Sequence, residues 1–249
     1  MFRLLILLLL LTLAAVPAQA DGWPSQWRAA IRSSDLTALS TLAGPDRDVD
    51  LADRRGRTAL MVAAANGDVI LLRRLLELGA DVDRRNSGGG TALMFAAQYD
   101  KAAVARLLLE RGARIDLQAA KGWTALMIAA LKGSDDVIDV LLEKGADPNI
   151  RDVQFFTPLM RAVAENREGA VQRLLSSDRV QVNAKDERGI GALHLAAAAG
   201  RLQITRLLLA RGADGNQRDG DGNTPKSLAE DAGHAEVLQL LEAWPQVAQ

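Results

Sequence analysis

The sequence predicts an all-α solenoid, in which short antiparallel helix pairs stack side by side and are joined by β-hairpin-like loops. Three observations predict this fold. A tetrad of residues recurs every 33 or 34 residues, a residue that tolerates positive φ follows each tetrad at a fixed distance, and a leucine-rich segment then usually ends at a Gly-Ala pair. A single helix pair of this kind cannot bury its apolar face, so it must stack on copies of itself.

Residues 1–20 have the pattern of a secretory signal peptide. Arg3 supplies a positive charge, residues 4–15 form an almost uninterrupted apolar stretch, and the small-residue triplet Ala18-Gln19-Ala20 suits a cleavage site. The alternative is an uncleaved membrane anchor, which needs about 20 apolar residues. We expect cleavage before Asp21 and a soluble, exported chain. The sequence has no cysteine, which favours a bacterial periplasm over an oxidising eukaryotic route.

Residues 21–249 are expected to form a single domain of seven repeated units. The first unit, about 24–50, is a degenerate helix pair, and the last is a C-terminal cap over 224–244. Between them lie five tetrad-bearing repeats. The six tetrads, including that of the cap, start at Thr58, Thr91, Thr124, Thr157, Gly191 and Thr224.

Each tetrad predicts the start of the first helix of its unit. A Thr hydroxyl accepts a backbone N–H at a helix start, and the next position favours Pro, as at Pro158 and Pro225. The third residue, as at Leu60, points inward. A left-handed turn nine residues after each tetrad begins would end this helix and start another. The residues at that position are Gly67, Asp100, Gly133, Asn166, Gly200 and Gly233.

The second helix of each unit is rich in leucine, as in residues 71–76, and stops at a glycine such as Gly79 or Gly145 that suits a helix C-cap. In the central repeat we expect Leu142 to be buried by its own unit and a neighbour. About a dozen polar residues with turn chemistry, as in 81–90, then precede the next tetrad and predict a β-turn or hairpin.

These residues closely resemble the ankyrin repeat, and the resemblance covers essentially the whole chain after the signal segment. The chain is similar to ankyrin-repeat proteins of an exported bacterial type. Met takes the place of the family's tetrad His in four repeats, so His194 alone could make the hydrogen bond of that His to the neighbouring hairpin. The fourth tetrad repeat carries one extra residue and lacks its Gly-Ala stop over residues 174–183. A local change of curvature is expected there.

Composition and motifs argue against catalysis and against a cofactor. The 30 basic and 31 acidic residues balance, so net charge does not indicate nucleic acid or an anionic membrane as a partner. His194 and His234 are too few for a metal site. The glycine-rich residues 87–91 lack the Lys of a phosphate-binding loop, and Arg218 interrupts the calcium-loop-like residues 214–223. We expect hairpin turns at both places, no enzyme activity, no catalytic residue, no metal and no cofactor.

The resemblance implies that function depends on a groove lined by hairpin tips and first helices, which the family uses to bind other proteins. In the family, the residue before each tetrad projects toward this groove. The expected partner-binding residues are Arg57, Trp123, Phe156 and Ile190, with Tyr99 and Leu131 extending the same strip on the first helices.

Two alternatives concern this strip. Trp123 and Phe156 could simply pack against adjacent hairpins. Phe155 takes the position of the family's hairpin glycine, so the hairpin could be bent and Phe156 turned aside.

The expected function is that of a periplasmic adaptor, which binds and stabilises or localises another exported protein and is itself a monomer. The alternative is an immunity protein or inhibitor that occludes a toxic enzyme in the periplasm.

Overall fold

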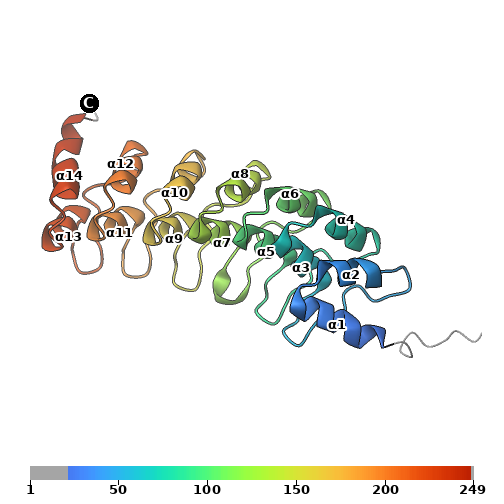
Figure 1. Cartoon of the computed structure of the whole chain (residues 1–249). Helices are drawn as coiled ribbons and strands as arrows, with labels where there is room; N and C mark the ends of the chain where they lie inside the picture. The colour runs from blue at the N-terminus through green and yellow to red at the C-terminus, as the bar shows by residue number, and fades with distance from the viewer. Residues whose placement is uncertain (1–21, 248–249) are drawn as a thin grey trace, which may run out of the picture.

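The computed structural model describes residues 22–247, which form an elongated stack of helix pairs (Figure 1). This confirms the all-α solenoid. Within the described range there is no β-strand beyond an isolated bridge between Lys185 and Gly191. The predicted signal peptide, residues 1–20, lies outside the described residues.

The helices alternate along the chain between two rows. Odd-numbered helices from α3 to α13 form one row and even-numbered helices from α4 to α14 the other, with the hairpin loops projecting beyond the odd-numbered row (Figure 1). The pairs are α1 (Trp23–Ser33) with α2 (Leu36–Leu42), α3 (Ala59–Asn66) with α4 (Val69–Glu77), α5 (Ala92–Gln98) with α6 (Ala102–Glu110), α7 (Ala125–Lys132) with α8 (Asp135–Glu143), α9 (Pro158–Ala164) with α10 (Glu168–Leu175), α11 (Ala192–Ala198) with α12 (Leu202–Ala210), and α13 (Pro225–Asp231) with α14 (Ala235–Val247).

The tetrads begin the odd-numbered helices from α3 to α13, as expected. The hydroxyl of Thr58 accepts a hydrogen bond from the N–H of Met61 at 3.4 Å, and Thr124 and Thr157 accept the equivalent bonds. Thr91 is also an N-cap residue but makes no such side-chain bond. The Thr caps are buried, so these hydrogen bonds satisfy donors that water cannot reach.

Left-handed residues join the two helices of each unit. Each of the six residues predicted at this turn has a positive φ, and Ser34 holds the equivalent place in the first unit with φ of 55°. Asp100 and Asn166 adopt this conformation with φ of 52° and 55°. Both belong to the residue types, Asp and Asn, that tolerate it best after glycine.

The core lies between the two helix rows and runs without interruption from Trp23 to Leu241. Alanines on the odd-numbered helices, such as Ala63 and Ala129, are fully buried, so their small size sets the close approach of neighbouring units. In α8 the fully buried leucine is Leu141, whereas Leu142 is only half-buried. The expectation for Leu142 was therefore wrong by one helix position.

Six hairpin turns, which we call fingers, project from the odd-numbered row. They are residues 52–57, 85–90, 118–123, 151–156, 185–190 and 218–223. In each, the N–H of the second residue donates to the carbonyl of the sixth, as from Asp53 to Arg57 at 2.9 Å. The sixth residue then leads directly into the helix cap, so the fingers hold side chains in register with the odd-numbered helices.

Candidate functional site

We call one surface of the stack the finger face; it comprises the last residue of each finger, the fifth residue counted from each tetrad start, and Tyr99 and Leu131 at the C-terminal ends of α5 and α7. The first set comprises Arg57, Gly90, Trp123, Phe156, Ile190 and Asn223. The second set comprises Val62, Phe95, Ile128, Arg161, Leu195 and Leu228. Ring contacts between Arg161 and both Trp123 and Phe156 join the two sets.

Five of the predicted partner-binding residues are partly accessible apolar side chains on this side of the stack. Tyr99 is 49% exposed at the end of α5. Trp123, Leu131, Phe156 and Ile190 are half-buried. The sixth, Arg57, is half-buried and pairs with Asp53 at 3.0 Å. Partial exposure leaves area on each ring and aliphatic chain that a partner could cover.

Arg57 and Tyr99 line a shared cavity of about 270 Å³ at the first end of the finger face. Val62 and Phe95 line it as well. Burial by itself would raise the pKa of Asp53, but hydrogen bonds from the N–H groups of Arg57 and Arg55 outweigh it and lower the pKa. Asp53 therefore stays ionised and fixes the Arg57 guanidinium at the cavity wall.

At the centre of the face, Arg161 lies over two aromatic rings. Its guanidinium carbon is 5.7 Å from the ring centre of Trp123 and 4.5 Å from that of Phe156. Its Nε donates to Oδ2 of the buried Asp152 at 2.8 Å, and Nη1 has no hydrogen-bond partner among the described residues. The cluster combines apolar area with a charged donor still available to a partner.

Sequence reasoning missed Arg161 and the rest of the second set. The available signal was the alignment of the tetrads, because the residue after the tetrad is apolar in all other repeats and is Arg only at 161. The same alignment would have identified Phe95, Ile128 and Leu195, which are half-buried beside the core.

The finger 151–156 is not bent, and Phe156 is not turned aside. Its second residue, Asp152, donates to the Phe156 carbonyl at 3.1 Å, and Phe155 donates to the Asp152 carbonyl at 2.9 Å, as in the other fingers. Phe155 itself adopts the left-handed conformation, with φ of 62°. The regular finger is thus kept at the cost of backbone strain, and its tip exposes Val153 and Phe155, which are 64% and 40% accessible.

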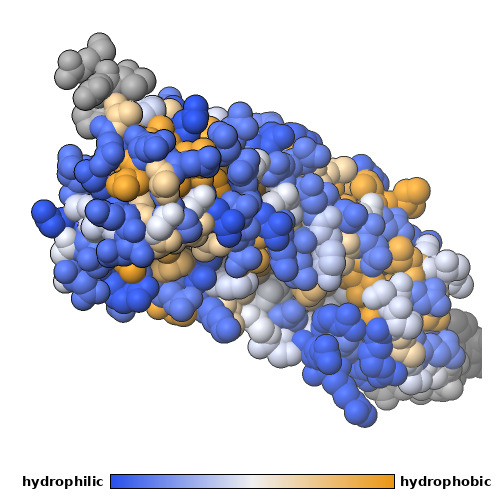
Figure 2. All heavy atoms as spheres, turned by 60° about the vertical axis from the view of Figure 1, so that its left-hand side comes forward, coloured by the Kyte–Doolittle hydropathy of each residue, from blue (hydrophilic) through white to orange (hydrophobic). Residues whose placement is uncertain are grey.

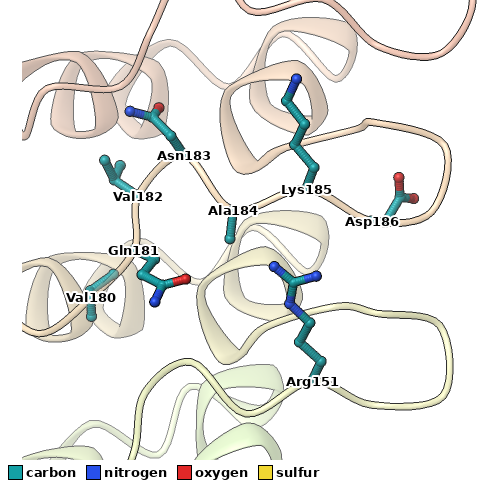
Figure 3. Close-up of a pocket in the computed structure, with 8 residues that line it drawn as sticks. All are labelled: Arg151, Val180, Gln181, Val182, Asn183, Ala184, Lys185 and Asp186. Carbon is teal, nitrogen blue, oxygen red and sulfur yellow. The ribbon is translucent and has the colours of Figure 1, made fainter.

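The fingers 151–156 and 185–190 are separated by an open cavity of about 770 Å³. Figure 3 shows Arg151 reaching from the earlier finger toward Ala184, while Lys185 points away from it toward the next unit. The cavity is otherwise lined by residues 180–186, the loop that follows the one-residue insertion. The Arg151 side chain makes no hydrogen bond or ion pair to the described residues.

Both histidines make structural contacts. In His194, Nδ1 accepts from the N–H of Gly191 at 3.1 Å, so Nε2 carries the proton and donates at 2.9 Å to the carbonyl of Gln217, the residue just before the next finger. This confirms the inter-repeat hydrogen bond expected of His194. Across residues 22–247, no group of three or more His, Asp or Glu side chains could hold a metal ion, and no helix is long and apolar enough to cross a bilayer.

Comparison with known families gives a match over most of the chain. A family model described as ankyrin repeats (3 copies) matches residues 27–119, 101–152, 115–186 and 159–243.

Hydrophilic residues cover most of the face in Figure 2, and hydrophobic residues appear on it as separate patches. The face seen in Figure 2 is therefore mixed in polarity.

Curated relatives match only in part. A transient receptor potential cation channel subfamily A member 1 homolog of Caenorhabditis elegans is 43% identical over 75 residues, which are 30% of this chain and 6% of the relative. Potassium channel AKT1 of Oryza sativa subsp. indica is 42% identical over 62 residues, 25% of this chain and 7% of the relative. Putative ankyrin repeat protein L271 of Acanthamoeba polyphaga mimivirus is 37% identical over 73 residues, 29% and 10% respectively. The chain thus covers a small fraction of each relative's length.

Proposed function

The chain belongs to the ankyrin-repeat family, and on that premise we propose that it is a non-enzymatic protein–protein interaction module whose finger face binds a second protein. One observation carries the proposal. Large apolar side chains that a stack of alanine-rich helices does not require are concentrated on the finger face, around Arg161 and its two aromatic neighbours. Aromatic and arginine side chains dominate the binding energy of protein interfaces.

Strain at Phe155 supports the same surface. A bulky residue with positive φ costs free energy that glycine would avoid, as glycine does in the other five fingers. Strain of this kind persists where a side chain has a role outside the fold. Phe155 and Val153 would add two apolar contacts beside the central cluster.

We further propose that the chain is exported and acts in a bacterial periplasm as a soluble monomer. The charge, apolar stretch and small-residue triplet of residues 1–20 support export. There it would act as an adaptor that binds and stabilises or localises another exported protein. The alternative is an immunity protein or inhibitor that occludes a toxic enzyme.

The test compares capture of protein partners by the native chain and by two variants. Tyr99→Ser with Leu131→Ser removes apolar area from the finger face. Ile70→Ser is the matched control, because Ile70 is 84% exposed on α4 in the other helix row. We expect a captured protein to be lost with the first variant and retained with the second, at unchanged melting temperatures. Equal capture by all three proteins would refute the finger face as the binding surface.

Activity of the captured protein then separates the two roles. A resident exported protein that stays active in the complex supports the adaptor. An enzyme that is silenced in the complex supports the inhibitor.

The cleavage site is tested by the intact mass of the protein purified from the periplasm. A mass that still includes residues 1–20 would contradict cleavage before Asp21.

A further inference from the structure

The first four fingers carry a strong excess of positive charge. Together the fingers 52–57, 85–90, 118–123 and 151–156 hold six basic and two acidic residues. In the last two fingers, three basic residues face four acidic ones. The excess is therefore local, in a chain whose formal net charge is −1.

The two acidic residues of the first four fingers do not offset this charge at the surface. The Asp53 side chain is 2% exposed and the Asp152 side chain 0%, and each is already paired with an arginine of the finger face. By contrast, Arg54, Arg55, Lys121 and Arg151 are exposed, and their side chains have no hydrogen bond or ion pair among the described residues. Four unpaired cations thus lie on the first four fingers.

Hydrogen bonds between fingers bring these cations into one row. The N–H of Ser87 donates to the Arg55 carbonyl at 3.0 Å, and that of Val153 donates to the Lys121 carbonyl at 3.0 Å. Ala120 makes the equivalent bond to Gly88 at 2.9 Å. Lys121 and Arg151 of this row belong to the two fingers that end at Trp123 and Phe156.

The opposite edge of the same four units has the reverse charge. The turns 44–51, 79–84, 112–117 and 145–150, which follow the even-numbered helices, contain seven acidic and three basic residues. The stack therefore has a basic finger edge and an acidic turn edge. Such polarity orients an approaching charged partner and speeds its association.

We propose that the finger face takes an acidic protein segment, one whose carboxylates meet Arg54, Arg55, Lys121 and Arg151 while its large apolar side chains cover Trp123 and Phe156. The inference rests on the proposed function and adds the chemistry of the partner. The apolar strip beside the cations distinguishes this occupant from a nucleic acid, which would require basic residues to follow its phosphates across the whole surface.

The experiment is selection from a displayed library of random peptides on the full chain. Peptides enriched on the native chain are expected to contain an excess of Asp and Glu together with aromatic or leucine residues. A finger variant with Arg54, Arg55, Lys121 and Arg151 all changed to Ser should bind the selected peptides about tenfold more weakly, since four exposed charge pairs are lost. Added salt should weaken the native complex in the same way.

The matched control changes four other exposed basic residues, Arg73, Arg84, Lys144 and Arg206, to Ser. This control changes the net charge by the same amount as the finger variant, but its four changed residues lie outside the fingers. It should therefore bind the peptides like the native chain. Equal loss in both variants would overturn the proposal, because net charge and not the finger row would then attract the peptide.

Three other outcomes also decide the matter. Apolar peptides without acidic excess, lost on the Tyr99→Ser and Leu131→Ser variant, would overturn the inference and leave the proposed function standing. Displacement of the peptide by a single-stranded oligonucleotide of the same net charge would indicate a site for polyanions in general and would also overturn the inference. No enrichment over the Tyr99→Ser and Leu131→Ser variant would count against both the inference and the proposed function.

Discussion

At the scale of single residues, Phe155 exposes a ring at the surface although its backbone conformation favours glycine. Its φ of 62° matches the 72° to 87° of the glycines at the same place in the other fingers, and its hydrogen bonds are the same. The finger geometry is thus set by the hairpin, and the side chain is forced into a conformation that disfavours a Cβ atom.

This strain predicts an unusual order of stability between two variants. Phe155→Gly should be more stable than Phe155→Ala by about 1 kcal/mol, because only glycine relieves the left-handed strain and both variants lose the ring. Urea melts of the two proteins measure the difference. In the helical control, Ala103→Gly should instead lose about 1 kcal/mol. An alanine at 155 as stable as glycine would show that the backbone there is not strained.

Asp116 shows a second conflict, between a hydrogen bond and a charge. Its carboxylate accepts the N–H of Asp147 in the next unit at 3.2 Å. At the equivalent positions, the neutral amide oxygens of Asn149 and Asn183 accept the corresponding hydrogen bonds at 2.8 and 2.9 Å. Burial, with the nearby charge of Asp147, raises the pKa of Asp116. The folded protein therefore binds this proton more tightly than the unfolded chain, and ionisation costs stability at neutral pH.

Asp116→Asn should consequently stabilise the protein at pH 7, by only about 0.5 kcal/mol because the site is half-buried and solvent still screens the charge. The gain should shrink as the pH falls through the raised pKa of Asp116 and vanish below its ordinary value of 3.8. Denaturant melts at several pH values measure this. A gain that stays constant with pH would mean that the carboxylate charge is not its source.

At the scale of helices, a comparison of equivalent buried positions in the repeats identifies one polar side chain among apolar ones. The fourth residue of the outer helices α4 to α12 is Leu72, Ala105, Ile138, Val171 and Thr205, and all five are fully buried. Only Thr205 is polar, and its hydroxyl has no hydrogen-bond partner. A buried donor left unsatisfied carries its full desolvation penalty.

Thr205→Val should therefore stabilise α12 against its neighbours by about 1 kcal/mol, since valine keeps the shape and removes the hydroxyl. The converse change at the equivalent position, Val171→Thr, should cost about 1 to 3 kcal/mol. The free energy of unfolding in urea measures both. A loss of stability in Thr205→Val would indicate that the hydroxyl has a partner after all.

At the scale of the whole molecule, period and capping residues were sufficient to predict the fold. The tetrads predicted the helix starts, and the tetrad position of His194 predicted its hydrogen bond to the next unit, because each depends on residues close in sequence or within one period. The Arg161 cluster could not be predicted in the same way, since Trp123, Asp152 and Phe156 come together only when fingers of two units stack on α9. Leu142 was misplaced because two adjacent leucines leave the helix register ambiguous.

At the junction that follows the insertion in the fourth tetrad repeat, a hydrogen bond between fingers is missing. The N–H groups of Ser87, Ala120, Val153 and Gly220 each donate to a carbonyl of the preceding finger. At Glu187, the equivalent residue, no such bond occurs within the described chain. The side chains of Arg85, Gln118 and Lys185 bond to the carbonyl of the first residue of the next finger, and Arg151 does not. The 770 Å³ cavity opens at this same junction.

A stack held by nearest-neighbour contacts should open first where those contacts are fewest. We expect the amide of Glu187 to exchange its hydrogen at least about tenfold faster than those of Ala120, Val153 and Gly220, because only Glu187 lacks an acceptor. At low urea concentrations, amides of residues 185–247 should then lose protection together, before those of residues 59–164. Hydrogen exchange followed by NMR measures both effects. Equal protection of the four finger amides, or one common opening of all units, would show that the missing bonds leave the junction as strong as the others.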